Sequence, residues 1–396
     1  MGTTFDLPNY HGQLFALSPE DTPFLSAIGG LTGGGMTDAT EFEWQGYDLR
    51  ARSQNVKLEG ATAPTAEQRV RSNLSNVAQI HQEKVSVSYT KQAATGQYAG
   101  ANVGAPANPV QDELSWQVEQ TIKEIAGDVN WSFINGVYQK PTDNTQARRT
   151  RGILQAAAAG TVDKGTNVAS GATTDASTDS VTPTAAHSLS VGDKVVFTRA
   201  GDSGLTVGQI YYVTSVSTTV SFKVATTSGG SAVALTDSAA NVDYHSLWTT
   251  ALTVDDINSF AKVIYDRGGL RNGLGTFIAG SDQVLALTSA CANAYAKANP
   301  FITGNEIGGV RVDQVLTPFG RLNIMLDTDI PADAIALASL DQCRPVLLNV
   351  PGKGVFFEEQ LAKTGASEDV QLYGEIGLDY GSPVAHGVLR GLKVAS

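Results

Sequence analysis

The tetrapeptide Gly201-Asp202-Ser203-Gly204 is the stretch of this chain that best matches a catalytic signature. It has the residue types that surround the nucleophilic serine of chymotrypsin-like proteases, and His187 precedes it. A catalytic serine needs a histidine and an aspartate that converge on it, together with an oxyanion hole. Here the tetrapeptide joins two short strand patterns in the turn-rich stretch 161–244, which is too small for a double barrel. We therefore interpret it as a β-turn.

Cofactor and metal sites have equally weak support. The glycine cluster 29–35 lacks the preceding strand and following helix of a dinucleotide-binding loop. The five histidines and two cysteines show no zinc-ligand spacing, and both cysteines have the apolar surroundings of reduced core residues. Asp327, Asp329 and Asp333 resemble half of a calcium loop without its glycine and closing glutamate, so turn and cap roles are favoured. We expect no enzyme, no cofactor and no bound metal.

Charge limits the possible partners. The net charge of −12 argues against a general binder of nucleic acid or of anionic membranes, but not against a protein that encloses nucleic acid. Arg148, Arg149 and Arg151 form a basic cluster that either contacts DNA or, more commonly in an acidic protein, pairs with carboxylates. His81 and Glu83 alternate along a strand pattern and are expected on one solvent-facing side. The sequence shows neither a signal peptide nor an apolar run long enough to span a bilayer.

One long helix is the element that would position other parts of the chain. The sequence predicts it over residues 108–136, with Asn108 as N-cap and Pro109 in the first turn. Apolar residues recur every three or four positions and form one stripe: Val110, Leu114, Val118, Ile122, Ile125, Val129 and Phe133. Four residues lie largely off this stripe: Trp116, Glu119, Lys123 and Trp131.

The residues before this helix form two kinds of segment. Residues 1–40 are irregular but apolar, which is typical of a segment that packs along another surface. In residues 41–90, two strand patterns flank the polar stretch 45–71, so an extended arm is predicted that cannot bury a core alone. The candidate inter-subunit residues of both segments are Phe5, Phe15, Phe24, Trp44, Arg50, Arg52, Lys57, Glu59, Arg69 and Arg71.

The remainder of the chain divides by composition. Residues 160–247 are rich in threonine, serine, valine and glycine, and they predict an independent β-rich module inserted into the host domain. Residues 248–345 predict two helices and several strands, the first helix beginning with a capping box at Thr253 and Asp256. Residues 346–396 alternate as strands. The fold class is therefore α+β with an all-β insertion.

Several separated stretches together resemble the major capsid proteins of tailed phages, in particular the SU10-like group with the HK97 fold. The stretches are residues 22–30, Glu41–Trp44, Glu59-Gly60, Phe133–Gly136, Arg151–Leu154, Gly374–Asp379 and Ala385–Val388. The resemblance covers about residues 1–158 and 248–396. Residues 184–236 separately resemble a small β module that recurs in phage structural proteins.

The resemblance implies a role for each segment. Residues 1–40 would be the N-arm, 41–90 the E-loop, 91–159 the P-domain with its spine helix 108–136, and 248–345 the A-domain. Residues 346–396 would complete the P- and A-domains, and the insertion 160–247 would project outward. The four off-stripe residues of the spine helix, Trp116, Glu119, Lys123 and Trp131, would be candidates for contacts with a neighbouring arm or with the inner content. The arm residue Lys57 has no recognisable asparagine partner, so covalent cross-linking between subunits is in doubt.

The function implied is that of a major capsid protein, which self-assembles into pentamers and hexamers of an icosahedral shell around double-stranded DNA. Its partners would be copies of itself, portal and scaffold proteins, and packaged DNA through weak non-specific contacts, with no membrane. It would be assembled in the host bacterial cytoplasm and reside in the virion capsid. An encapsulin-like compartment shell shares the fold and is one alternative; a phage tail or tube protein is another.

Overall fold

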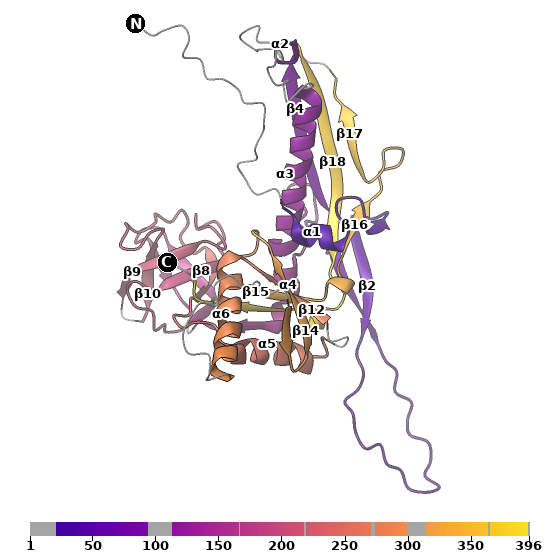
Figure 1. The fold of residues 1–396 in the computed structure, drawn as a ribbon, viewed down its shortest axis with the longest axis vertical. Helices are drawn as coiled ribbons and strands as arrows, with labels where there is room; N and C mark the ends of the chain where they lie inside the picture. Colours follow the sequence, from indigo (N-terminus) through magenta and orange to yellow (C-terminus); the bar gives the residue numbers. More distant parts are fainter. Residues whose placement is uncertain are drawn as a thin grey trace.

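The computed structural model describes residues 21–93, 113–165, 167–217, 219–270, 274–298, 314–362 and 365–394. Figure 1 shows an elongated molecule. A long sheet with one long helix forms the upper part, a second sheet with two helices lies below it, a β-barrel lies to the side, and a narrow loop extends from the lower end.

The long sheet is built around strand β18 (Ser367–Asp379). Strand β4 (Gln79–Ser88) pairs antiparallel with it over ten residue pairs, from Ser88↔Ser367 to Gln79↔Ile376. Along its other edge β18 pairs first with β17 (Phe356–Gln360) and, further along, with β16 (Arg344–Leu348). Strand β1 (Gly35–Thr37) pairs in parallel with β16. The sheet therefore combines residues from both ends of the sequence.

Helix α3 (Glu113–Asn135) lies along this sheet (Figure 1). Its buried face carries Ile125, Val129 and Phe133, which belong to the predicted stripe. Helix α1 (Pro23–Ile28) packs on the same core, and helix α2 (Tyr89–Ala93) follows β4. The helix ends at the predicted Asn135-Gly136 stop, whereas the predicted start at Asn108 and Pro109 lies outside the described residues.

The second sheet has six strands in the order β13-β14-β12-β15-β19-β5. Their bounds are Gln314–Thr317, Gly320–Leu326, Leu274–Ala279, Ile335–Ala338, Gly387–Arg390 and Thr161–Asp163. Helices α5 (Val254–Asp266) and α6 (Ser281–Ala298) contribute to its core, in which Phe260 stacks on Phe277. The capping box at Thr253 and Asp256 is confirmed.

A closed six-stranded barrel lies between β5 and α5 in the sequence, with the order β10-β7-β6-β11-β8-β9. The strand bounds are Ser221–Ala225, Ser180–Thr182, Val168–Asp175, Asn241–Ser246, Lys194–Arg199 and Ile210–Ser217. Its core is a cluster separate from those of the two sheets and includes Phe197, Phe222 and Tyr244. Each barrel strand can thus form its hydrogen bonds without help from the rest of the chain.

The short connecting elements lie between these bodies. Helix α4 (Ile153–Ala156) and the 3₁₀ helix η1 (Ala158–Gly160) lead into β5, and the 3₁₀ helices η2 (Leu340–Gln342) and η3 (Pro383–Ala385) precede β16 and β19.

Two boundaries differ from those predicted. Strand β2 (Glu41–Tyr47) pairs with β3 (Arg71–Val77), so the second strand of the arm lies earlier than expected. Residues 79–88, placed in the arm by the sequence pattern, are β4 of the long sheet because β18 supplies a long-range partner. Within the predicted N-terminal arm, α1 and β1 belong to the chain's own core and sheet.

Candidate functional site

The arm is an antiparallel ribbon of β2 and β3 that is fixed to the long sheet at its base. The indole Nε1 of Trp44 donates to the carbonyl oxygen of Gly381 at 2.7 Å, and its ring meets Tyr380 edge-on at 4.8 Å between centroids. Phe42 stacks on Trp44. Trp44, a predicted inter-subunit residue, is therefore half-buried against its own chain and anchors the arm.

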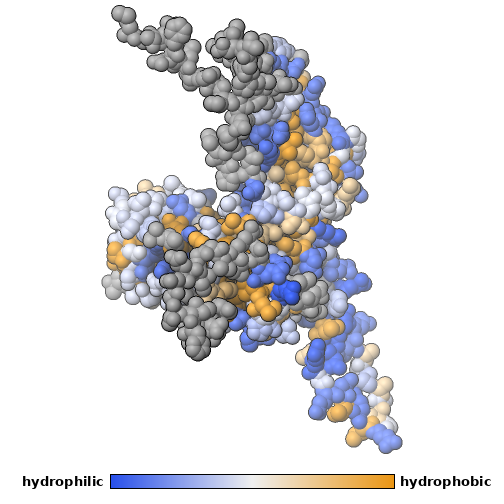
Figure 2. Space-filling model, in the orientation of Figure 1, coloured by the Kyte–Doolittle hydropathy of each residue, from blue (hydrophilic) through white to orange (hydrophobic). Residues whose placement is uncertain are grey.

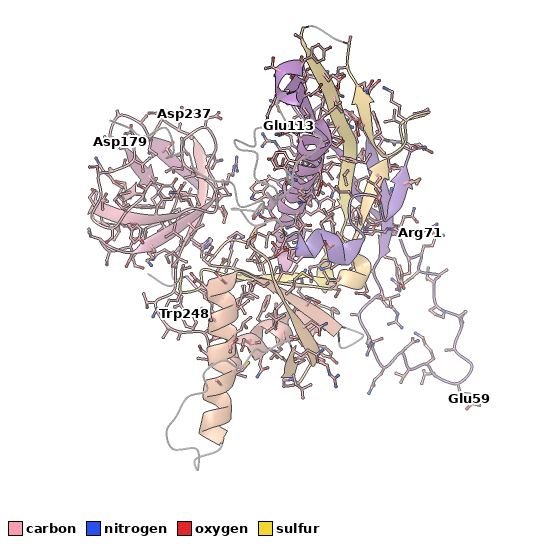
Figure 3. The ribbon with its side chains drawn as sticks, turned by 45° about the horizontal axis from the view of Figure 1, so that its top comes forward. Glu59, Arg71, Glu113, Asp179, Asp237 and Trp248 are labelled. Atoms are coloured by element: carbon pink, nitrogen blue, oxygen red, sulfur yellow. The ribbon has the colours of Figure 1, made fainter. Side chains whose placement is uncertain are left out.

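Beyond the paired residues Tyr47 and Arg71, residues 48–70 form a long loop without strand or helix, here called the distal loop. Figure 3 shows it leading away from the body, with Arg71 at its base and Glu59 near its far end. Every residue of the distal loop is exposed, including four large apolar ones. These are Leu49, Val56, Leu58 and Val70, and Figure 2 shows separate apolar patches among hydrophilic atoms along this projection.

The predicted charged contacts of the arm are exposed. Arg50, Arg52, Lys57, Glu59 and Arg69 lie in the distal loop. Arg69 pairs with Glu67 at 2.9 Å, and Arg50 donates to Ser53 Oγ at 3.1 Å, both within the loop. At the base, Arg71 donates to Gln45 at 3.0 Å across the ribbon. Exposed local pairs of this kind contribute little stability, so they leave the loop available to a partner.

The aromatic residues predicted as N-terminal contacts do not share one environment. Phe24 is completely buried in the core beneath α1, so the prediction that its side chain meets another subunit is wrong. The physical reason is that α1 closes the end of the core against α3. Phe5 and Phe15 lie outside the described residues.

The predicted contact residues of α3 differ in exposure. Trp131 exposes 53% of its surface, Trp116 is half-buried, and Glu119 lies 3.7 Å from Lys123 in an exposed pair one helical turn apart. Near Trp131, α3 and β4 enclose a half-open groove of about 340 Å³, here called the α3–β4 groove. Its lining residues are Gln79–Glu83, Ile125, Asp128, Trp131 and Ser132.

His81 lines the α3–β4 groove and corrects a sequence-based expectation. It is only 7% exposed, rather than solvent-facing beside Glu83, because α3 covers this part of β4. Burial lowers the pKa of His81 to about 4, so its ring is uncharged at neutral pH. Burial also raises the pKa of Asp128 across the groove, and the nearby Glu83 and Asp329 act in the same direction.

Neither Asp327 nor Ser203 has the environment of a catalytic or metal-binding residue. The carboxylate of Asp327 accepts from the backbone N–H of Phe24 at 3.3 Å, and the amide of Asn130 donates to Asp327 and Asp329. Ser203 is buried and donates to the carbonyl oxygen of Ala200 in a turn. Within the described ranges, no group of three or more His, Cys, Asp or Glu residues could hold a metal ion.

A buried contact between a histidine and an aspartate at the base of the barrel was not predicted. His245 Nε2 lies 2.6 Å from Asp333 Oδ2, and each side chain is 2% exposed. The same carboxylate oxygen accepts from the backbone N–H of Gly391 at 3.1 Å. This contact joins β11 to the loop before β15, and the sequence carries no local signal for it because the pair is separated by 88 residues.

Comparison with known proteins decides the family. The family model described as SU10 major capsid protein matches residues 1–393. The chain belongs to this family. It is a bacteriophage major capsid protein, a structural protein of the virion capsid. No curated protein matches the sequence.

A solved capsid structure shares the fold of this capsid protein. The capsid of cyanophage A-1(L) has a TM-score of 0.53 at 12% identity, covering 98% of this chain and 97% of that one. The capsid of a native GTA particle has a TM-score of 0.49 at 12% identity, with 98% and 96% covered. The holo-SrpI encapsulin of Synechococcus elongatus PCC 7942 has 0.48 at 10%, with 99% and 94% covered. The family match favours a phage capsid protein over the encapsulin alternative.

Two of the three arginines considered for DNA contact in this capsid protein have partners in their own chain. Arg148 pairs with Glu375 at 2.8 Å in a half-buried site. Arg151 donates to the hydroxyl of Tyr380 at 3.0 Å and stacks over Tyr138. Only Arg149 of the three is exposed, so a cluster of three DNA-facing arginines is corrected to one exposed side chain. No helix among the described residues has the length and apolarity to cross a membrane.

Proposed function

We propose that this capsid protein assembles into hexamers and pentamers of an icosahedral shell enclosing double-stranded DNA, and that the distal loop binds a neighbouring copy. The observation that carries the proposal is the distal loop itself. It exposes four large apolar side chains at the end of a ribbon that has no core of its own. A two-stranded ribbon is only marginally stable alone. The exposed apolar side chains of the distal loop therefore need a surface of another molecule to pack against.

The other parts of the chain fit distinct roles in such a shell. The β2–β3 ribbon with the distal loop acts as the E-loop, the long sheet with α3 as the P-domain, and the six-stranded sheet as the A-domain. The barrel projects outward, because the inner face of a shell must pack against DNA. Portal and scaffold proteins are further partners, contacts with DNA are weak and non-specific, and assembly occurs in the host cytoplasm.

The contacts between copies need not be strong individually. In a closed shell each copy contacts several neighbours, and many weak contacts act together. The acidic character of the chain, with a net charge of −12, keeps its attraction to the enclosed DNA low.

The test is to shorten the ribbon without disturbing its base. Tyr47 and Arg71 are directly paired, so residues 48–70 can be replaced by Asn-Gly, which closes an antiparallel pair as a type I′ turn. We expect a soluble protein with an unchanged thermal midpoint that forms no shells by negative-stain microscopy and sedimentation. A control variant keeps the loop length but replaces residues 48–70 by glycine and serine. It should also form no shells if the side chains of the distal loop make the contacts between copies. Normal shells from the Asn-Gly variant would refute the proposal.

A further inference from the structure

The α3–β4 groove contains negative charge that the chain does not neutralise. Asp128 on α3 and Glu83 on β4 both line it. Within the described part of the chain, neither carboxylate forms an ion pair with a lysine or arginine. Burial and the nearby Glu83 raise the pKa of Asp128, which reflects the cost of holding these carboxylates together. A cation in the groove would relieve this repulsion.

The groove also contains an unused acceptor. His81 is only 7% exposed, yet its Nε2 has no hydrogen-bond partner among the described residues. An unpaired buried polar atom is unfavourable, and most such atoms in folded proteins are paired. Because the ring is uncharged at neutral pH, this nitrogen can accept a hydrogen bond and does not repel a cation.

Trp131 supplies the third feature of the site. Its ring lines the groove but remains 53% exposed, and it lies three residues after Asp128 on the same side of α3. The face of an exposed indole attracts guanidinium and ammonium groups. The two carboxylates, the uncharged histidine nitrogen and the indole together form a site that fits the cationic end of an arginine or lysine side chain.

The distal loop carries the complementary charge. Residues 48–71 contain five basic side chains, Arg50, Arg52, Lys57, Arg69 and Arg71, and three acidic ones, Asp48, Glu59 and Glu67. This stretch is therefore positive in a chain whose net charge is −12. Arg52 and Lys57 are exposed, and no hydrogen bond or ion pair links either side chain to the described residues.

We propose that the α3–β4 groove receives a basic side chain, Arg52 or Lys57, from the distal loop of a second copy of this chain. The cation lies between the Asp128 and Glu83 carboxylates, against the Trp131 ring, and donates to His81 Nε2. This inference rests on the proposed assembly and specifies the surface that the loop meets. When Lys57 supplies the cation, its exposed apolar neighbours Val56 and Leu58 flank it.

The experiment places a benzophenone amino acid at Trp131 and irradiates shells formed from a mixture of ¹⁴N- and ¹⁵N-labelled chains. Mass spectrometry should identify a cross-link between residue 131 and a peptide from residues 48–71, with mixed isotopes that prove contact between copies. The same probe at Leu285, which is 67% exposed on α6, is the control and should give no such cross-link. Shells without the Trp131 cross-link would refute the groove contact and leave the assembly intact.

Charge reversal provides a second measurement. It tests the contact between the distal loop and the groove even if the benzophenone probe blocks assembly. Asp128→Lys should lower the yield of shells at least tenfold, whereas Asp202→Lys, the same change at an exposed turn of the barrel, should not. Equal yields from the two variants would refute the groove contact. Failure of the unaltered chain to form any shells would instead refute the proposed assembly on which the contact depends.

Discussion

At the scale of single residues, His81 makes the stability of the protomer depend on pH. Its pKa is about 4 in the folded chain and near 6.5 when the chain unfolds. Between these values the unfolded state binds more protons, so stability is complete above pH 6.5 and declines as the pH falls towards 4. This lowering of the pKa of His81 corresponds to roughly 3 kcal/mol of unfolding free energy, which is lost as the pH falls from 6.5 towards 4.

His81→Leu should therefore remove most of this decline, because leucine cannot take up a proton. Urea unfolding of the unassembled protein at several pH values from 4 to 7 measures the effect. His386, whose pKa is also lowered by burial, should leave a residual dependence in the variant. If both proteins lost the same stability between pH 6.5 and 4, His81 would not be the group responsible.

Single residues also show the limits of sequence reasoning. Alternation correctly placed His81 and Glu83 on one side of a strand, but it could not show that α3 covers His81. The expectation that most of the arginine cluster pairs internally was sound for Arg148, yet its partner Glu375 lies 227 residues away. Partners at such distances depend on the fold and leave no local pattern.

At the scale of elements, the short helix α1 depends on a polar contact with α3 and β14. The carboxylate of Asp327 accepts hydrogen bonds from the backbone of Phe24 and from the Asn130 amide, while Asn130 Oδ1 accepts from the backbone of Leu25 at 2.9 Å. Asp327→Ala should leave the backbone N–H of Phe24 without its acceptor and the Asn130 amide with Asp329 alone, at a cost of about 2–4 kcal/mol of unfolding free energy. Chemical denaturation measures this loss.

The matched control for this substitution is Asp38→Ala, which truncates an exposed aspartate near the same end of the chain. It should change the unfolding free energy by less than about 0.5 kcal/mol. Hydrogen exchange in residues 23–28 should accelerate in the Asp327 variant alone. Similar protection of α1 in both variants would show that apolar packing of Phe24 and Leu25 is sufficient to hold the helix.

Elements defined by local signals were predicted well. The capping box at Thr253 and Asp256 fixed the start of α5. By contrast, the division between β3 and β4 was missed, because only pairing with β2 or with β18 distinguishes them. A continuous alternating pattern does not reveal that its two halves enter different sheets.

At the scale of the whole molecule, the barrel is joined to the six-stranded sheet at a compact junction. The backbone N–H of Lys164 donates to Arg390, and that of Trp248 donates to Gly391 at 2.7 Å. Trp248 lies at this junction in Figure 3, and the Lys164 ammonium lies over its ring. The composition of residues 160–247 predicted a β-rich module, but the His245–Asp333 contact that orients the barrel required the structure.

The last prediction is that this capsid protein folds and assembles without its barrel. Gly165 approaches Ser246 so closely that an added Cβ would lie 1.8 Å from the Ser246 carbonyl oxygen, so the two ends of the barrel are adjacent. Replacing residues 166–246 by Gly-Ser-Gly should therefore close the gap while retaining the Lys164 and Trp248 contacts. We expect a soluble protein that forms shells of normal diameter in electron micrographs, with surface density lost where the barrels project.

Removing the barrel also removes His245, which would leave the buried Asp333 side chain without this partner. Burying a carboxyl group without its partner is costly, and an amide in its place cannot ionise, so the deletion should be made with and without Asp333→Asn. We expect the Asp333→Asn version to be the more stable of the two in thermal unfolding. If both versions were insoluble, the six-stranded sheet would need the barrel to fold, because β5 and β19 would then lack support that the junction alone cannot supply.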